Sequence, residues 1–325
     1  MPGGLPDNGN MRGKDRVAVI DVGSNTIKVL CVEGCEGRLR KLGAESVEAR
    51  LGGEHRGDRP WLTDERRRAA VQAIQDLLEF SKIHSVDKVE LVATSAVRDA
   101  ENNGVFHAEV ERAVGLSLRI LSESQEALFI GRGIACDPGV PDGNSFRAVD
   151  LGGGSMECIL YQDGSVEQGV SLPLGAVRLT RALDSNGQRP MTDEEVARVQ
   201  AIVLNELSEI SPALGGTGPI VGCGGAFSVS RAILADRAGL TYEAMQARMS
   251  TADLAGLFEE LRALPVEERS RIPHLPAGRA DILPVALLVL LTVAEDSGVR
   301  EYHHSHYNLR FGLAATLLGH FVDEG

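Results

Sequence analysis

The fold is decided by residues 16–32, which read RVAVIDVGSNTIKVLCV. The runs Arg16–Val22 and Thr26–Val32 are apolar and rich in β-branched residues, and a glycine, a serine and an asparagine separate them. Short apolar runs bounded by such turn formers are typical of buried strands. The stretch therefore predicts two strands joined by a tight turn, with the carboxylate of Asp21 near the end of the first strand.

The same strand, glycine turn and strand pattern occurs again in the middle of the chain. Phe146–Leu151 is a second apolar run, Gly152–Ser155 forms the turn, and Met156–Tyr161 resumes strand composition. An aspartate, Asp150, again lies near the end of the first strand. A large unit that recurs once predicts two related α/β lobes rather than an array of small repeats.

The rest of the chain mixes helical and strand patterns, and its last third is mainly helical. Ser122 and Gln125 have the S-x-x-Q form of a capping box, which predicts a helix from there to about Ala135. Thr63 precedes two acidic residues and an apolar face, as at the start of a capped helix. The other expected elements are strands at Lys88–Thr94, Ser117–Leu121 and 219–221, helices at Phe106–Val114, near Phe227 and at Ile282–Ala294, and helix starts at Thr192 and Ser250.

The composition is that of a globular chain with about two domains. It has 325 residues, 43% of them hydrophobic and 24% charged, and 33 basic against 46 acidic residues give a formal net charge of −13. Such an acidic surface disfavours general binding of nucleic acid or of anionic membranes. Because the longest apolar run is shorter than the ~20 residues of a membrane span and residues 1–16 lack the apolar core of a signal peptide, a cytoplasmic location is expected.

Each of the two turns combines a carboxylate with an accessible backbone. Glycines let backbone N–H groups approach an anion, so such a turn can cradle a phosphate while Asp21 or Asp150 holds Mg²⁺, directly or through water. A single turn of this kind is more often only a hairpin, but two matched turns favour a phosphate site. A third glycine cluster, Gly222–Ala226, by itself indicates only a turn.

Four segments together resemble the exopolyphosphatase and guanosine pentaphosphate phosphohydrolase (Ppx/GppA) family. They are residues 17–31 (VAVIDVGSNTIKVLC), 93–102 (ATSAVRDAEN), 148–157 (AVDLGGGSME) and 171–180 (SLPLGAVRLT). The resemblance covers about residues 16–318. It implies an α/β fold of the actin, sugar-kinase and Hsp70 superfamily, with two ribonuclease-H-like lobes, each a mixed sheet with flanking helices, and an active site in the cleft between them.

The resemblance also implies an activity and a domain organisation. The expected activity is Mg²⁺-dependent removal of terminal phosphate from inorganic polyphosphate or from guanosine pentaphosphate. We expect a flexible tail at residues 1–15, a first lobe at 16–122 that the returning chain at 305–325 completes, and a second lobe at 123–304. The chain resembles the short two-domain members of the family, which lack the additional C-terminal helical domains of longer ones.

By the same resemblance, Glu126 is the catalytic base. It lies in the segment SESQEA at 122–127, which is similar to the family's S-G-x-E-E-A helix start and departs from it at Gln125, where many members have a second acid. A carboxylate in the first turn of a helix is held in its ionised form by the helix dipole, so it is ready to accept a proton from water. Without the resemblance, a glutamate at this position would more often be a surface residue.

The other site residues implied by the resemblance bind phosphate or metal. The expected phosphate clamp is formed by both turns, two basic residues hold the polyanion, and three carboxylates surround Mg²⁺. Three further arginines are weaker candidates for the positive lining, or for salt bridges between the lobes. The phosphate clamp consists of Ser24, Asn25, Gly152, Gly153, Gly154 and Ser155, and the two basic residues are Lys28 and Arg98. The carboxylates around Mg²⁺ are Asp21, Asp150 and Glu157, and the three further arginines are Arg178, Arg279 and Arg310.

Some segments depart from the family pattern. Residues 222–226 read GCGGA where threonine is common at the last position, residues 309–312 read LRFG in place of L-R-E-G, and residues 51–54 read LGGE in place of L-G-E-G. These changes leave the choice among substrates open. The histidines at 303, 304 and 306 (YHHSHY) form a cluster that a transition metal could use, but a polar strand end is the favoured interpretation.

Three function classes remain open at this stage. A phosphoanhydride hydrolase is preferred because Glu126 and Glu157 accompany both turns. An ATP-dependent small-molecule kinase of the same superfamily would share the phosphate loops, and a non-catalytic sensor of polyphosphate or alarmone would bind without turnover. The expected partner is inorganic polyphosphate or guanosine pentaphosphate, with a homodimer as a further option and with neither nucleic acid nor a membrane.

Overall fold

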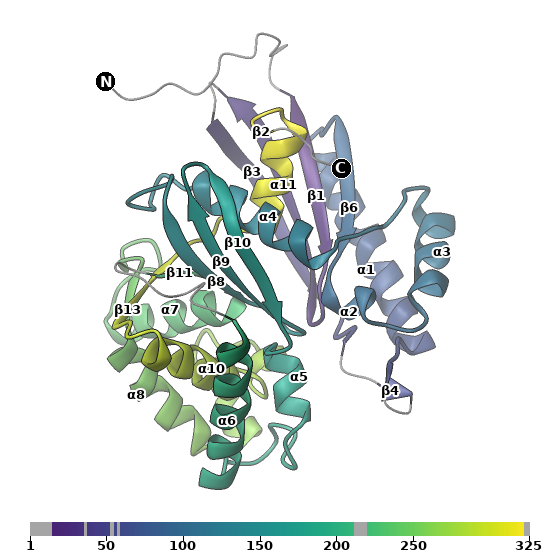
Figure 1. Cartoon of the computed structure of the whole chain (residues 1–325). Coiled ribbons are helices and arrows are strands. Elements are labelled where there is room, and N and C mark those ends of the chain that lie inside the picture. Colours follow the sequence, from purple (N-terminus) through teal and green to yellow (C-terminus); the bar gives the residue numbers. More distant parts are fainter. Residues whose placement is uncertain (1–14, 36–37, 53–54, 57–58, 211–219, 322–325) are drawn as a thin grey trace, which may run out of the picture.

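The computed structural model of the chain describes residues 15–35, 38–52, 55–56, 59–210 and 220–321, and it contains two mixed β-sheets with helices packed on them (Figure 1). The predicted N-terminal tail lies, except for Asp15, outside the described residues. So do Gly53 and Glu54 of the partly retained family segment.

The first sheet grows from the turn that opens the chain. Strand β1 pairs antiparallel with β2 and parallel with β6, and β7 continues the sheet beyond β6. The side chains of β1 alternate between two hydrophobic clusters, Val17 and Val19 on one face and Ala18 and Ile20 on the other, so this strand is buried on both sides. In spatial order the strands are β3 (Arg38–Glu48), β2 (Thr26–Cys35), β1 (Arg16–Val22), β6 (Lys88–Ala93) and β7 (Arg119–Ile120).

The second sheet repeats this topology. Strand β8 pairs antiparallel with β9 and parallel with β11, as β1 does with β2 and β6, and the parallel pair of β11 and β13 corresponds to that of β6 and β7. The repetition is the two-lobed arrangement expected from the sequence. In spatial order the strands are β10 (Ser165–Leu172), β9 (Met156–Gln162), β8 (Phe146–Leu151), β11 (Ile220–Gly224), β13 (Glu301–His304) and β12 (Arg248–Ser250).

Helices and a short hairpin complete each half. On the first sheet these are α1 (Asp64–Ile83), α2 (Ser95–Arg98), α3 (Asn103–Val114) and the hairpin of β4 (His55–Arg56) with β5 (Arg59–Pro60). On the second they are α5 (Ala176–Arg181), α6 (Asp193–Glu209), α7 (Gly225–Arg237), α8 (Thr251–Arg262), α9 (Val266–Arg269), a 3₁₀ turn (Ala277–Arg279) and α10 (Leu283–Asp296).

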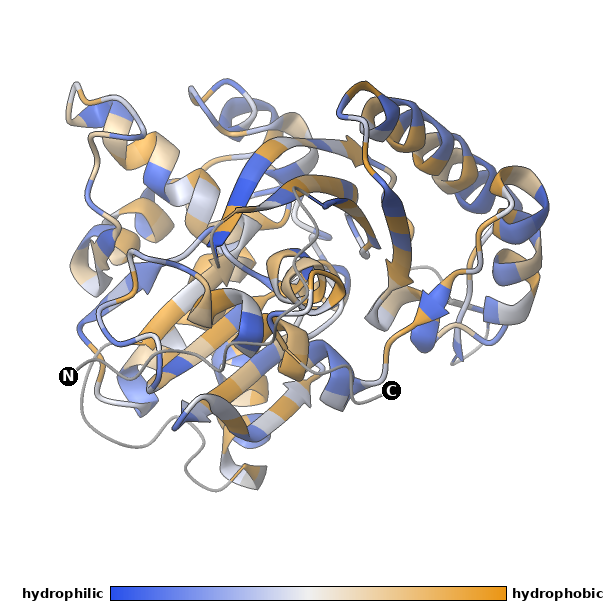
Figure 2. Ribbon diagram, turned by 90° about the horizontal axis from the view of Figure 1, so that it is seen from above, coloured by the Kyte–Doolittle hydropathy of each residue, from blue (hydrophilic) through white to orange (hydrophobic). Residues whose placement is uncertain are grey.

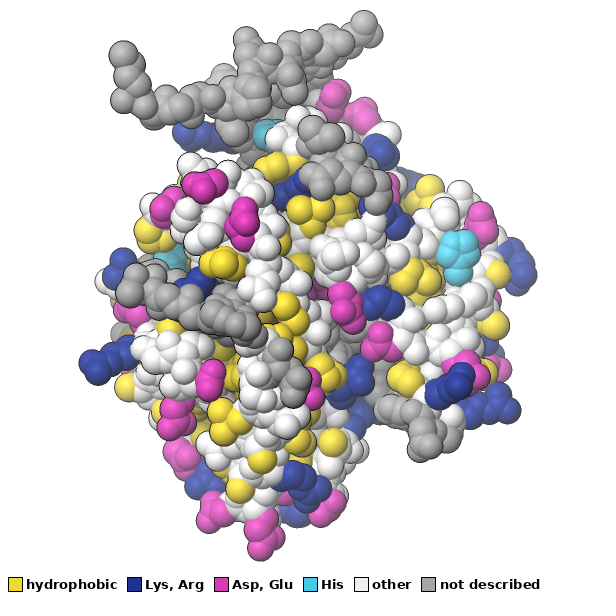
Figure 3. Space-filling model, viewed as in Figure 1, with side chains coloured by type: hydrophobic (Ala, Val, Ile, Leu, Met, Phe, Trp, Pro, Cys, Tyr) yellow, Lys and Arg dark blue, Asp and Glu magenta, His cyan; other side chains and the backbone are white. Residues whose placement is uncertain are grey.

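Hydrophobic residues gather on the strands and on the helix faces turned toward them, while the outer helix faces are hydrophilic (Figure 2). Helix α10 is apolar all round and is buried among α5, α6, α7 and α8, which explains its long apolar run. None of the helices in the described part of the chain is both long and apolar enough to cross a membrane. On the face shown in Figure 3, acidic and basic side chains are interspersed, and neither sign forms a continuous patch.

Two helices lie between the sheets and join them. Helix α4 (Glu123–Ala135) packs on β9 and β10, helix α11 (Leu309–Leu317) packs on β1 and β2, and the two helices pack on each other (Figure 1). Because α4 and α11 contact each other as well as the sheets, the division of the chain into lobes at residues 122 and 305 stays a prediction.

The crossing of α4 and α11 depends on two glycines. A Cβ atom at Gly312 would lie 2.7 Å from the backbone nitrogen of Gly133 and would also overlap the backbone of Phe129. The backbones of the two helices therefore approach too closely for a side chain at this position. Since α4 begins beside the pocket described below, this contact also fixes the start of that helix relative to the first sheet.

We expect Gly312→Ala to destabilise the protein by roughly 1–3 kcal/mol, because the added methyl group overpacks the contact between α4 and α11. Gly256→Ala in α8 is the matched control, since a Cβ atom there meets nothing within 4 Å and helix propensity favours alanine. Urea denaturation of both variants measures the difference in free energy of unfolding. Equal stabilisation by the two substitutions would contradict the overpacking argument.

Candidate active site

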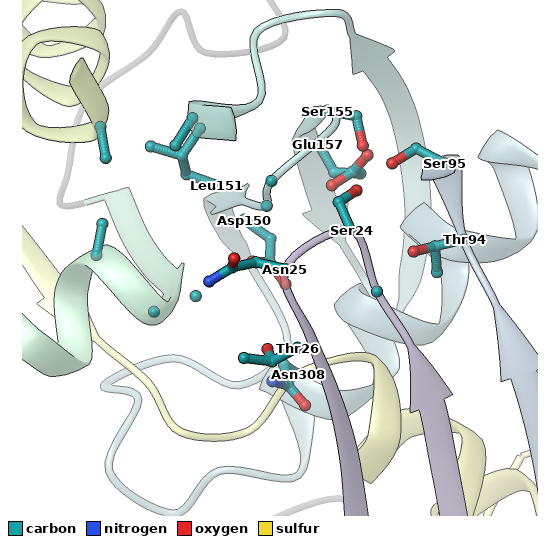
Figure 4. Close-up of a pocket in the computed structure, with 18 of the residues that line it drawn as sticks. Ser24, Asn25, Thr26, Thr94, Ser95, Asp150, Leu151, Ser155, Glu157 and Asn308 are labelled. Carbon is teal, nitrogen blue, oxygen red and sulfur yellow. The ribbon is translucent and has the colours of Figure 1, made fainter. Parts of the chain in front are cut away.

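A pocket lies between the two sheets, where the two predicted turns meet the start of α4 (Figure 4). Its lining includes ten of the twelve site residues expected from the sequence. These are Asp21, Ser24, Asn25, Lys28, Glu126, Asp150, Gly152, Gly153, Ser155 and Glu157. The remaining two, Arg98 and Gly154, lie directly behind this lining and contact residues that belong to it.

The first turn joins β1 to β2 and is closed by a hydrogen bond from the Gly23 backbone N–H to the Thr26 carbonyl, 3.3 Å long. Ser24 is buried and faces the second turn. The side-chain amide of Asn25, expected to bind phosphate, donates to the Gly278 carbonyl over 3.3 Å. Asn25 therefore also ties the first turn to the segment that carries Arg279.

The second turn joins β8 to β9 and lies tightly against the first. A Cβ atom at Gly153 would lie 2.9 Å from Cβ of Ser24, and one at Gly154 would lie 2.8 Å from Oγ of Ser24. Glycine is therefore required by space at both positions, and the backbone of the turn is exposed to whatever the pocket holds. The Gly152 N–H donates to the Ser155 carbonyl over 3.0 Å and closes the turn.

Glu126 is placed by the capping box at the start of α4. The Ser122 hydroxyl accepts from the Gln125 backbone N–H over 3.2 Å, and the Gln125 side chain accepts from the Ser122 N–H over 3.1 Å. Gln125, the departure from the family pattern, thus serves as a helix cap. With the first turn fixed in this way, Glu126 points into the pocket and is only 6% exposed.

Arg98 holds the carboxylate of Glu126. Its Nη1 atom donates to Glu126 Oε2 over 2.8 Å and to the Leu121 carbonyl over 3.1 Å. Burial raises the pKa of Glu126 to about 7, against the lowering effect of the Arg98 guanidinium. A carboxylate with a pKa near neutrality is well matched to accepting a proton from water. Arg98, predicted to bind the polyanion, therefore contacts the candidate base.

Asp21, Asp150 and Lys28 line the pocket, and Arg310 lies beside the two carboxylates. Burial raises the pKa of Asp150 to about 6 and that of Asp21 above its ordinary value, while Lys28 and Arg310 oppose the shift. Burial, with Arg310 and Arg279 nearby, lowers the pKa of Lys28 to about 8. Lys28, Arg279 and Arg310 thus place positive charge in or beside a pocket that also holds carboxylates, and this charge can hold a polyanion next to them.

The arrangement of Asp21 fits a bound cation. Its Oδ1 atom is buried and has no hydrogen-bond partner among the described residues, and such an atom is costly to leave alone. The described residues contain no group of three or more His, Cys, Asp or Glu side chains that could hold a metal ion. Mg²⁺ needs no such group, since one or two carboxylates, substrate phosphates and water complete its six ligands. Asp21 and Asp150 therefore suit Mg²⁺ better than a transition metal.

Glu157 lies on β9, directly opposite Asp150 in the β8/β9 pair, and lines the pocket. It is buried and accepts from the Ser171 hydroxyl over 2.9 Å, and burial together with the charges of Glu126 and Asp150 raises its pKa well above the ordinary value. In Figure 4, the side chains of Ser24, Ser95, Ser155 and Glu157 point toward one another. They form a polar end of the pocket next to both turns.

Several pocket residues were missed by the sequence argument. Ser95 lines the pocket, and Ser171 donates to Glu157; both lie in the segments that resemble the family, at 93–102 and 171–180, so a signal for them was available. Asn308, which caps α11 and lines the pocket, carried no such signal. Two of the weaker arginine candidates from the sequence also lie here, since Arg279 lines the pocket and Arg310 lies beside Asp21, where it donates to the Val29 carbonyl over 3.2 Å.

The third glycine cluster and the histidines lie on the second sheet. Gly224 and Gly225 line the pocket at the start of α7, and a Cβ atom at Gly225 would overlap the guanidinium of Arg279. His303 and His304 end β13, in line with the favoured interpretation of a polar strand end, whereas His306 lies beyond the strand. The ring centroids of His304 and His306 are 4.5 Å apart. The Nε2 atom of His304 forms a hydrogen bond with the Ser228 hydroxyl, and that of His306 forms one with the Tyr242 hydroxyl.

The geometry defines a class of protein. Two mixed sheets of repeated topology, each contributing one of the two predicted phosphate turns to the pocket between them, make this a two-lobed α/β protein. The model of the Ppx/GppA phosphatase family matches residues 32–321, so the chain belongs to that family. It is therefore a hydrolase that acts on acid anhydrides in phosphorus-containing compounds.

Individual relatives resemble the chain over nearly its whole length. Exopolyphosphatase 2 of Mycobacterium tuberculosis is 29% identical, over 94% of this chain and 99% of the relative. The guanosine-5'-triphosphate,3'-diphosphate pyrophosphatase of Aeromonas hydrophila is 26% identical, over 96% of this chain and 61% of the relative. The crystal structure of an exopolyphosphatase from Cytophaga hutchinsonii superposes with a TM-score of 0.84 at 24% identity and covers 94% of this chain and 98% of its own.

Proposed function

We propose that the protein is an Mg²⁺-dependent hydrolase that releases terminal orthophosphate from inorganic polyphosphate, with guanosine pentaphosphate as a second substrate. The observation that carries the proposal is the buried carboxylate of Glu126, held by Arg98 beside two phosphate-binding turns. The similarity to exopolyphosphatase 2 over 99% of that relative supports polyphosphate as the first choice. A lysine at position 28 is a point charge that suits a chain of equivalent phosphates.

Different residues of the pocket would bind the phosphates and the metal ion. The backbone of Gly152 and Gly153, with Ser24, Asn25 and Ser155, would bind the terminal phosphate, and Lys28 with Arg279 would hold the next ones. Asp21 and Asp150 would hold Mg²⁺, which when bound would supply charge neutralisation at the phosphate oxygens. Glu157 stays only a predicted third ligand, since the described residues contain no group of three such side chains that could hold a metal ion.

Hydrolysis then needs one proton transfer and one bond exchange. Glu126 accepts a proton from a water molecule as the water oxygen attacks the terminal phosphorus. The bond from that phosphorus to the bridging oxygen breaks, and the bridging oxygen leaves with the shortened chain. Arg98 keeps Glu126 oriented toward the pocket, so it is a positioning residue for this step.

Phosphate release by the purified protein with Mg²⁺ tests the proposal, with short polyphosphate, long polyphosphate, guanosine pentaphosphate and ATP compared side by side. We expect release from polyphosphate without any added acceptor. Binding of polyphosphate without release from any of the four compounds would identify a sensor instead. Phosphate loss from ATP alone, and only with an added acceptor, would identify a kinase.

A further inference from the structure

A second pocket lies on the far side of the two turns from Lys28 and Arg279. It shares Ser24, Ser95 and Gly153 with the active-site pocket. Its other lining comes from α2, α5 and the segment at 60–62, and includes Ala96, Trp61, Arg178 and Arg181. The two pockets are therefore neighbours with a common wall, and the turn that would bind the terminal phosphate forms part of that wall.

The wall is thin and contains no bulky side chain. It consists of the hydroxyls of Ser24 and Ser95 against the backbone of Gly153 and Gly154, where a Cβ atom at Gly154 would lie 2.8 Å from Ser24 Oγ and overlap the Ser95 hydroxyl. Figure 4 shows both hydroxyls directed toward Ser155 and Glu157, at the active-site end. A small displacement of the two serines would join the pockets.

The proposed reaction creates a need for a second opening. After cleavage, the shortened polyphosphate still occupies the side lined by Lys28 and Arg279, and orthophosphate is left at the turns, enclosed between the chain and the wall. If the remaining chain stays bound for the next cleavage, the product cannot leave past it. An exit on the opposite side lets the substrate advance by one phosphate without dissociating.

We propose that the second pocket is an orthophosphate site through which the product leaves, and that the ion pair of Arg178 with Asp99 closes it. The inference rests on the proposed function, because only a substrate that stays bound requires a separate exit. The ligand class is a free phosphate dianion. Arg178 is the residue that recognises it, and Asp99 is the carboxylate that it displaces.

The contacts of Arg178 place it at this exit. Its Nε atom donates to the Gly154 carbonyl over 2.8 Å, so the guanidinium sits directly on the phosphate-binding turn. Its Nη2 atom donates to Asp99 Oδ2 over 2.8 Å and thereby spans from α5 to the end of α2. The side chains of Arg178 and Asp99 are 38% and 33% exposed, so a phosphate that reaches them has reached solvent.

Further positive charge surrounds the opening. Arg181 lines the same pocket, and the guanidinium of Arg56 stacks 4.8 Å from the centre of the Trp61 ring. A phosphate dianion forms bidentate hydrogen bonds with arginine in preference to lysine. In the described part of this pocket the cationic residues are arginines, whereas the substrate side includes the buried Lys28.

Ala96→Leu tests the exit because Ala96 lines the second pocket and not the first. Orthophosphate formed is counted after acid quenching, and orthophosphate released is counted with a fluorescent phosphate-binding protein, both during the first turnovers on polyphosphate with Mg²⁺. We expect an unchanged rate of the first cleavage, a delayed release signal and a steady-state kcat at least about fivefold lower, because product release becomes limiting. Ala108→Leu, on the exposed side of α3, is the matched control.

Because Ala96→Leu could fail to fold, a second variant is blocked at the same position by chemical labelling after it has folded. The variant Ala96→Cys is treated with a bulky maleimide and compared with wild-type protein treated alike, since the chain has five cysteines of its own. Delayed release after treatment of the variant alone supports the exit. Coincident formation and release in the labelled variant would overturn the exit while leaving the hydrolase intact. No acid-quenched orthophosphate from the untreated wild type would overturn the hydrolase itself.

Discussion

Replacing Glu126 with glutamine is expected to lower kcat for phosphate release by about 10²–10⁴-fold, the usual contribution of a positioned general base. Glutamine keeps the size of the side chain and can still accept a hydrogen bond from Arg98, but it cannot take a proton from water. Because Lys28 and Arg279 are unchanged, polyphosphate binding should be retained. Initial rates of phosphate release and a separate binding isotherm measure the two effects.

Glu123→Gln is the matched control, since Glu123 lies in the same first turn of α4 but is exposed. We expect nearly wild-type rates for this variant. Equal losses in Glu123→Gln and Glu126→Gln would show that the charge of the helix start matters, rather than a base in the pocket. Full activity of Glu126→Gln would remove Glu126 from the mechanism.

The local parts of the fold were predictable because their signals are short-range. The strand Arg16–Val22 has the bounds that its apolar run predicts, and the helix after Ser122 begins with the predicted capping box. Helices that start after Thr192 and Ser250 are likewise capped by these side chains. Caps and buried strands each depend on a few adjacent residues, so one sequence suffices to locate them.

The edge strands were missed for a physical reason. Strand β3 is largely exposed and reads RLRKLGAESVE, so it has neither the apolar run of a buried strand nor a clean alternation. Strand β10 is likewise half-exposed at the edge of the second sheet. Such strands are stabilised mainly by hydrogen bonds to the neighbouring strand rather than by burial. Because backbone hydrogen bonds do not depend on residue type, a single sequence does not indicate where this pairing occurs.

The candidate site was predictable in its residues but not in its pairings. Both turns, Glu126 and the acidic residues lie at one pocket, as the family resemblance implies. The contact of Arg98 with Glu126 and that of Arg178 with Asp99 join segments far apart in the chain, and charge alone offered each arginine several partners. Arg310 shows the same limit, because only the packing of α11 on β1 and β2 brings it beside Asp21.

The carboxylates of the metal-free pocket make a contribution to stability that is lost as the pH rises. Burial raises the pKa of Asp150 from 3.8 to about 6, so between these values the folded state binds more protons than the unfolded state. The contribution of Asp150 to stability is therefore fully present below about pH 4, and a cost on the order of 3 kcal/mol from this carboxylate is fully present above about pH 6. The pKa values of Asp21, Glu126 and Glu157 are also raised, so their contributions have the same sign.

Mg²⁺ should offset this cost, because a cation beside Asp21 and Asp150 stabilises their charged forms. Thermal melting at pH 8 is therefore expected to shift upward with Mg²⁺, and the shift should be much smaller at pH 5. Asp150→Asn should melt higher than the wild type in metal-free buffer at pH 8 and lose most of the shift. Asp163→Asn, in an exposed turn where asparagine also fits, should behave like the wild type. An equal Mg²⁺ shift at both pH values, or one that survives Asp150→Asn, would place the metal away from these carboxylates.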